Sequence, residues 1–67
     1  MNVGRSIKVG LARSGGPDNH KDLAKELGIS QLRVSALVGQ KTANGTRIKE
    51  LADIFGVTAS QFIEWGE

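Results

Sequence analysis

The sequence predicts an all-α domain of five short helices, because three patterns recur along its 67 residues. Apolar residues repeat at helical spacing, and no segment alternates in the manner of a strand. A glycine follows each periodic segment, where it accepts the left-handed conformation of a helix end; these are Gly15 with Gly16, Gly28, Gly39, Gly56 and Gly66. A residue that can cap a helix precedes each segment; these are Asn2, Asn19, Ser30, Thr46 and Thr58.

The first helix is expected over residues 3–13, with an apolar stripe made by Val3, Ile7 and Leu11. Gly4 and Gly10 lie inside this helix, and each weakens it by about 1 kcal/mol relative to alanine. The clearest break in the chain follows at Ser14–Asp18, which reads Ser-Gly-Gly-Pro-Asp. Such a cluster of turn residues predicts a loop between the first two helices.

Two shorter helices are expected next, over residues 20–27 and 31–38. Their apolar residues are Leu23, Ala24 and Leu27 in the first, and Val34, Leu37 and Val38 in the second. Only Gly28, Ile29 and Ser30 separate them, and a three-residue link that begins with glycine predicts a sharp crossing. The small side chain of Ala24 would let the two backbones approach, and Ile29 would fill the gap beneath the turn.

The last two helices are expected over residues 47–55 and 59–65. The first has Ile48, Leu51, Ala52 and Phe55 at helical spacing. Just before it, Asn44-Gly45-Thr46 is typical of a turn. The second contributes Phe62, Ile63 and Trp65, which are expected to cover the first or fourth helix. The alternative is that some of these three form a dimer contact.

Charge divides the chain unequally. Residues 1–49 carry nine Lys or Arg against three acids, a net charge of +6, whereas residues 50–67 carry four acids and no base, a net charge of −4. A basic body with an acidic end suggests that one face meets a polyanion, although ordinary solvated charge would give the same count.

Composition argues against several classes of protein. The chain has no cysteine, one histidine and no glycine loop followed by Lys-Ser or Lys-Thr, so enzyme activity, a metal and a cofactor are not expected, and no small-molecule ligand is evident. No apolar run reaches the roughly 18 residues needed to span a bilayer, and the N-terminus lacks the apolar core of a signal peptide. The expected location is therefore the cytoplasm.

The exposed side of the helix over 31–38 has the features of a recognition helix, which enters the major groove of DNA with its N-terminal residues against base edges. Gln31 can pair with adenine, while Leu32 and Ala36 can contact thymine methyl groups. Residues on the flanks and in the following loop are candidates for phosphate contacts: Arg33, Lys41, Thr42, Asn44 and Arg47.

The chain from Asn19 to Gly39 resembles the helix-turn-helix of the lambda-repressor-like phage regulators, the Cro and repressor type. The resemblance covers nearly all 67 residues, and rests on Ala24, Gly28 and the aliphatic residues Leu23, Ile29, Val34 and Leu37. It implies that the third helix reads bases through Ser30, Gln31, Leu32, Ser35 and Ala36, and that His20 contacts phosphate. The implied partners are a double-stranded DNA operator and, at least on DNA, a second copy of the chain.

Three departures from the family pattern accompany this resemblance. His20 stands where the family often has glutamine, the loop at Gly15–Asp18 is longer than usual, and the chain ends at Glu67 without a separate oligomerisation domain. The favoured function is a Cro-like transcriptional repressor. An antitoxin, an excision-type factor, or a protein-interaction module centred on Leu32 are the alternatives.

Overall fold

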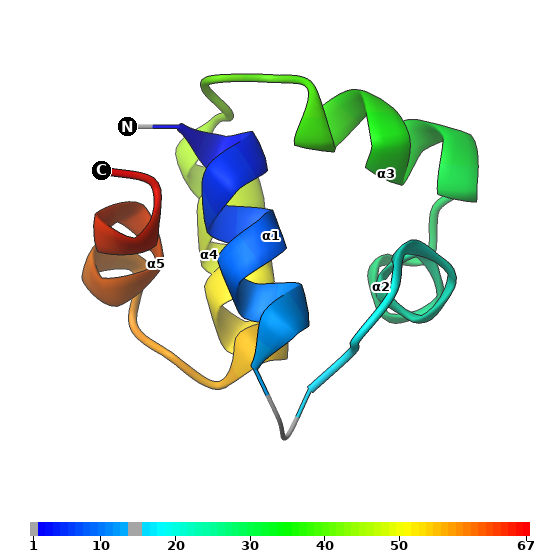
Figure 1. The fold of residues 1–67 in the computed structure, drawn as a ribbon, viewed down its shortest axis with the longest axis horizontal. Coiled ribbons are helices and arrows are strands. Elements are labelled where there is room, and N and C mark those ends of the chain that lie inside the picture. Colours follow the sequence, from blue (N-terminus) through cyan, green and yellow to red (C-terminus); the bar gives the residue numbers. More distant parts are fainter. Residues whose placement is uncertain (1, 14–15) are drawn as a thin grey trace.

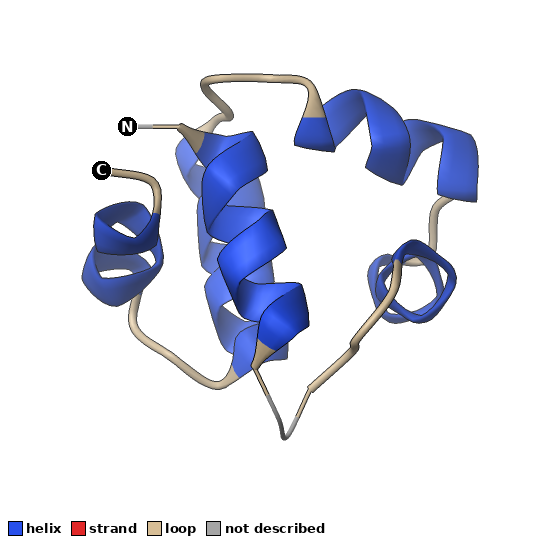
Figure 2. Ribbon diagram, viewed as in Figure 1, coloured by secondary structure: helices blue, strands red, loops and turns tan. Residues whose placement is uncertain are grey.

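The computed structural model describes residues 2–13 and 16–67, and these residues form five α-helices and no strands (Figures 1 and 2). The predicted all-α class is therefore confirmed. The helices are α1 (Val3–Ala12), α2 (His20–Leu27), α3 (Gln31–Val38), α4 (Gly45–Phe55) and α5 (Ala59–Trp65). None of the helices in the described part of the chain is long and apolar enough to cross a membrane.

Two predicted helix bounds are wrong. Helix α1 ends at Ala12 and not at residue 13, because Arg13 has extended backbone angles (φ −88°, ψ 151°). Helix α4 begins at Gly45, two residues before the expected start, because the Oδ1 atom of Asn44 accepts a 2.7 Å hydrogen bond from the N–H of Arg47. Asn44 is therefore the N-cap in place of Thr46, and Asn44-Gly45-Thr46 starts a helix where a turn was expected.

The other four predicted N-caps are confirmed. In each case the side-chain oxygen accepts the backbone N–H three residues later, which satisfies a donor that the helix itself leaves free. The pairs are Asn2 with Arg5, Asn19 with Asp22, Ser30 with Arg33, and Thr58 with Gln61. Each helix begins where the sequence provides this oxygen.

The predicted glycine ends are of two kinds. Gly28 and Gly56 have left-handed backbones, with φ of 70° and 72°. Gly39 and Gly66 have negative φ values of −82° and −92°, so the left-handed explanation is wrong for these two. Gly15, whose role was part of the same prediction, lies outside the described residues.

The two glycines inside α1 lie where the helix closely approaches other parts of the chain, which helix propensity does not reveal. A Cβ atom on Gly4 would lie 1.9 Å from the carbonyl oxygen of Val38, and one on Gly10 would lie 2.8 Å from the Phe55 ring. At Gly4 the close atoms are backbone, so α1 approaches the end of α3 more closely than any side chain there would allow, whereas a side chain at position 10 would require the Phe55 ring to move. The glycines weaken α1 as an isolated helix but permit its packing.

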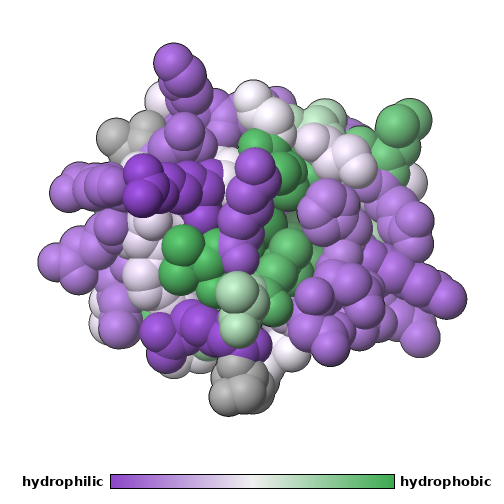
Figure 3. Space-filling view, viewed as in Figure 1, coloured by the Kyte–Doolittle hydropathy of each residue, from purple (hydrophilic) through white to green (hydrophobic). Residues whose placement is uncertain are grey.

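Helix α1 lies at the centre of the fold and contacts α3, α4 and α5, whereas α2 packs on α3 and α4 (Figure 1). The core between the helices consists of apolar side chains that solvent hardly reaches: Val3, Ile7, Leu23, Ala24, Val34, Ile48, Leu51, Ala52 and Phe62. Each helix contributes at least one of them, so all five helices share one core. In the view of Figure 3, polar side chains cover most of the surface and apolar ones gather near its middle.

Three aromatic rings join α4 and α5. The rings of Phe55, Phe62 and Trp65 have centroids 6.0–6.2 Å apart, a separation at which aromatic pairs attract one another. Phe62 is fully buried, while Ile63 and Trp65 are half-buried against the core. The prediction that α5 covers the first or fourth helix is confirmed, since it contacts both.

Candidate nucleic-acid interface

The turn between α2 and α3 is fixed by backbone hydrogen bonds. The N–H of Gly28 donates to the carbonyl oxygen of Lys25 (3.3 Å), and that of Ile29 donates to Ala24 (3.0 Å). These two hydrogen bonds, together with the left-handed backbone of Gly28, form the Schellman motif that ends a helix. Ser30, the next residue, is the N-cap of α3. In Figure 1, α2 is seen nearly end-on while α3 lies across the view, so the two helices cross steeply.

Packing sets which side of α3 faces outward. Val34 is completely buried, and Leu37 and Val38 are half-buried against the core. Ala24, only 4% exposed, provides the small contact that the crossing requires, and Ile29 packs beneath the turn.

The opposite side of α3 is free of packing. All five residues predicted to contact bases are exposed: Ser30, Gln31, Leu32, Ser35 and Ala36. Leu32 is 81% exposed and is the one large hydrophobic side chain in the described residues that lies so far out in solvent. Except for Leu32, this surface has the small and polar side chains that fit against base edges.

The loop after α3 is attached to the start of α1. The N–H groups of Val3 and Gly4 donate to the carbonyl oxygens of Lys41 (2.9 Å) and Gln40 (3.0 Å). Since the first N–H groups of a helix have no partner within it, the loop carbonyls satisfy two such donors of α1. The backbone beside α3 is thereby held in place, while the side chains of Lys41 and Thr42 remain exposed.

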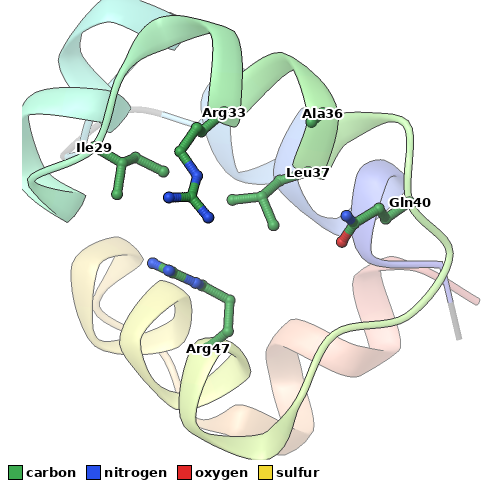
Figure 4. A pocket seen from close by; sticks show the side chains of 6 residues that line it. All are labelled: Ile29, Arg33, Ala36, Leu37, Gln40 and Arg47. Atoms are coloured by element: carbon green, nitrogen blue, oxygen red, sulfur yellow. The ribbon is translucent and has the colours of Figure 1, made fainter.

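Two predicted phosphate contacts lie together at the side of α3. A hollow of about 130 Å³ between α3 and α4 is lined by Ile29, Arg33, Ala36, Leu37, Gln40 and Arg47. Figure 4 shows the guanidinium groups of Arg33 and Arg47 pointing toward each other across it. Arg33 is exposed, and the side chain of Arg47 is 27% exposed with one nitrogen 3.6 Å from a carboxylate oxygen of Glu50.

Other predicted phosphate contacts are more separate. His20 is the half-buried first residue of α2, and no hydrogen bond or ion pair found in residues 2–13 and 16–67 links it to the hollow. Asn44 is exposed, but its Oδ1 atom is used in capping α4, which leaves its amide NH₂ free to donate.

Sequence reasoning missed Gln40, which lines the hollow beside the two arginines. It also assigned Leu37 to the core alone, although this side chain reaches the hollow as well. Neither residue type indicates such a position, which results from the way α1 and α2 bring α3 and α4 to the same hollow.

The chemistry of this surface is that of hydrogen bonding and positive charge. Within the described residues, no group of three or more His, Cys, Asp or Glu side chains could hold a metal ion. No protein-family model, curated protein or solved structure matches this chain. What the surface of α3 does must therefore be inferred from the arrangement of its own residues.

Proposed function

We propose that this chain is a sequence-specific DNA-binding regulator that inserts the exposed side of α3 into the major groove. The proposal rests mainly on one observation. Helix α3 is capped, crosses α2 steeply and buries Val34, while five positions on its other side are exposed to solvent. Those positions are Ser30, Gln31, Leu32, Ser35 and Ala36. A helix presented in this way fits the width of the major groove.

Charge supports the same proposal. Arg33, Arg47 and Lys41 lie beside this surface in α3, in α4 and in the loop between them. Cations beside a recognition helix would neutralise phosphates and fix its register on the duplex. The acids of residues 50–67 follow the first turn of α4, so the net negative charge belongs to the later part of the chain.

Within this proposal the favoured role is a Cro-like repressor that occupies an operator in the cytoplasm and blocks transcription. Two copies on DNA would place their recognition helices about 34 Å apart, one turn of the duplex. The operator would then be a pseudo-palindrome.

Selection of bound duplexes from a random pool, near physiological salt, tests the proposal. Enrichment of two inverted half-sites about ten base pairs apart supports a dimeric regulator, and a single half-site supports a monomeric reader. Absence of any enrichment, with a folded helical protein, would contradict DNA recognition.

Individual residues sharpen the test. Gln31→Ala should cost about 1–3 kcal/mol of binding energy and relax preference at one base pair. Gln61→Ala, at an exposed glutamine of α5, is the matched control and should leave the preference unchanged. A uniform loss of affinity across all sequences would remove Gln31 from the base contacts.

Salt dependence separates phosphate contacts from base contacts. Lys41→Ala should reduce the slope of log affinity against log salt by about one unit without changing preference. Lys8→Ala, at an exposed lysine of α1, should leave the slope intact.

The 81% exposure of Leu32 favours a second candidate function, in which the same surface binds another protein. Covering a large apolar side chain that solvent surrounds is favourable, because apolar surface is removed from water. Binding that depends on Leu32 but little on salt would support this candidate over DNA recognition.

A further inference from the structure

Arginine occupies the same unfavourable position in three helices. Arg5, Arg33 and Arg47 are each the third helical residue, three places after the capping Asn2, Ser30 and Asn44. The first turn of a helix is its positive end and favours an acid, and a glutamate or glutamine at the third position completes a capping box. Helices α2 and α5 follow that rule with Asp22 and Gln61.

Two of these arginines are also directed at each other. Arg5 is exposed on α1, but the guanidinium groups of Arg33 and Arg47 converge across the hollow between α3 and α4 (Figure 4). Like charges repel one another, so this convergence opposes stability in addition to the helix dipoles. Both the cations at the positive ends of helices and the facing like charges are unfavourable for folding. Such locally unfavourable features are typical of a functional site.

The neighbouring carboxylate neutralises this positive charge only loosely. Glu50 approaches Arg47 to 3.6 Å, beyond the length of a good hydrogen bond, and its side chain is 48% exposed. A surface ion pair of this kind is worth about 0–1 kcal/mol. Arg33 has no ion pair among the residues that the structure describes.

The size and lining of the hollow restrict the ligand. About 130 Å³ is well below the roughly 300–1,000 Å³ of clefts that hold drug-sized molecules. It exceeds the share of several waters, at about 30 Å³ each. A small anion fits, with Ile29 and Leu37 as apolar lining and the amide of Gln40 as a further polar contact.

Guanidinium groups match oxyanions, because their N–H donors form a planar fork that binds two oxygens at once. We propose that Arg33 and Arg47 together bind one phosphate group, as the two sides of a single oxyanion site between α3 and α4. The group is either a phosphate of the DNA backbone or free phosphate, and free phosphate in the site would compete with DNA. The DNA version rests on the proposed function, whereas binding of free phosphate does not.

Titration with inorganic phosphate at constant ionic strength, followed by the NMR signals of the arginine side chains, tests the site directly. The wild type should show saturable shifts for Arg33 and Arg47 together. Arg33→Lys and Arg47→Lys keep the charge but lose the fork, so each should weaken binding about tenfold. Glu50→Gln should tighten it, since a competing carboxylate is removed.

Arg5→Lys is the matched control, because it changes the same residue type at the same helical position but is not among the residues that line the hollow. It should leave phosphate binding unchanged. An equal loss in Arg5→Lys would show that phosphate responds to general positive charge, and would overturn the joint site.

The source of the phosphate is distinguished with a bound duplex in which single phosphates are replaced by neutral methylphosphonates. If both arginines hold one backbone phosphate, one particular methylphosphonate should remove the difference in DNA affinity between the wild type and Arg33→Lys. The same methylphosphonate should also remove the difference between the wild type and Arg47→Lys. That result supports the site even where free phosphate does not bind. Saturable binding of free phosphate that is lost in both variants supports the oxyanion site even if the protein binds no duplex. The proposed DNA-binding function can therefore be refuted while the oxyanion site is confirmed.

The proposal is overturned if two results are both negative. Free phosphate would cause no saturable NMR shift of the arginine side chains, and no single methylphosphonate would remove the affinity losses of both variants. It is also overturned if different phosphates account for Arg33 and Arg47, since the two side chains would then act as independent contacts. Circular dichroism of each variant checks that the helices are intact.

Discussion

Replacing Gly4 by alanine should destabilise the fold, although helix propensity alone predicts the opposite. Alanine inside a helix is favoured over glycine by about 1 kcal/mol. In this structure the added Cβ would lie 1.9 Å from the carbonyl oxygen of Val38 and 2.8 Å from its carbonyl carbon. Both are backbone atoms, so relief requires α1 to move away from the end of α3.

The magnitude follows from three contributions. Overpacking a core contact costs about 1–3 kcal/mol, sometimes more, and withdrawal of α1 would strain the 3.0 Å hydrogen bond from Gly4 to Gln40, worth about 1 kcal/mol. Subtracting the propensity gain of about 1 kcal/mol leaves a net loss of about 1–3 kcal/mol. For a chain of this size, 1 kcal/mol corresponds to about 4–8 °C in Tm.

Thermal and urea unfolding followed by circular dichroism measure this loss. Gly45→Ala is the matched control, because nothing lies within 4 Å of a Cβ at this first position of α4 and its φ is not positive. Gly45→Ala should leave stability unchanged or raise it by up to about 1 kcal/mol. If Gly4→Ala raises stability to the same degree, the close approach of α1 to α3 is refuted.

Four further substitutions test local features of the fold. Gly28→Ala should cost about 1–2 kcal/mol in urea unfolding, because its φ of 70° strains an L-residue although nothing lies within 4 Å of the new Cβ; an unchanged midpoint would argue against the left-handed helix end. Asn44→Ala should cost about 1 kcal/mol and Thr46→Ala almost nothing, and the reverse order would make Thr46 the true cap of α4. Arg13→Ala should cost about 0.5–1 kcal/mol and alter the fluorescence of Trp65, because the guanidinium carbon lies 4.8 Å from the ring centroid; identical spectra would exclude that contact.

The elements that the sequence predicted correctly depend on neighbours along the chain. Caps such as Asn19 and Ser30 act three residues away, and a left-handed glycine such as Gly28 acts on the turn that precedes it. The start of α4 was missed because Asn44 and Thr46 can both cap a helix and Gly45 between them favours a turn. The choice between two such residues depends on backbone angles that residue types do not determine.

Features that depend on contacts between distant residues could not be predicted. The sequence shows Gly4 and Gly10 only as weak points of a helix, because Val38 and Phe55, which require them, lie far along the chain. In the same way, Arg33 and Arg47 were expected among the phosphate contacts on the flanks and in the following loop, with no indication that they share one site. Their convergence on one hollow arises because α1 and α2 each pack on both α3 and α4 and so bring those two helices to the same hollow, which no spacing reveals.

The attachment of the loop after α3 to α1 has a consequence for how the surface could change. The N–H groups of Val3 and Gly4 bind the backbone carbonyls of residues 41 and 40, and every amino acid supplies such a carbonyl. Proline alone is unsuitable at position 40, where the backbone N–H donates to Leu37. Side chains at these two positions can therefore be exchanged, by evolution or in a designed library, without disturbing the anchor, so the charge and polarity beside α3 can diversify on an unaltered framework.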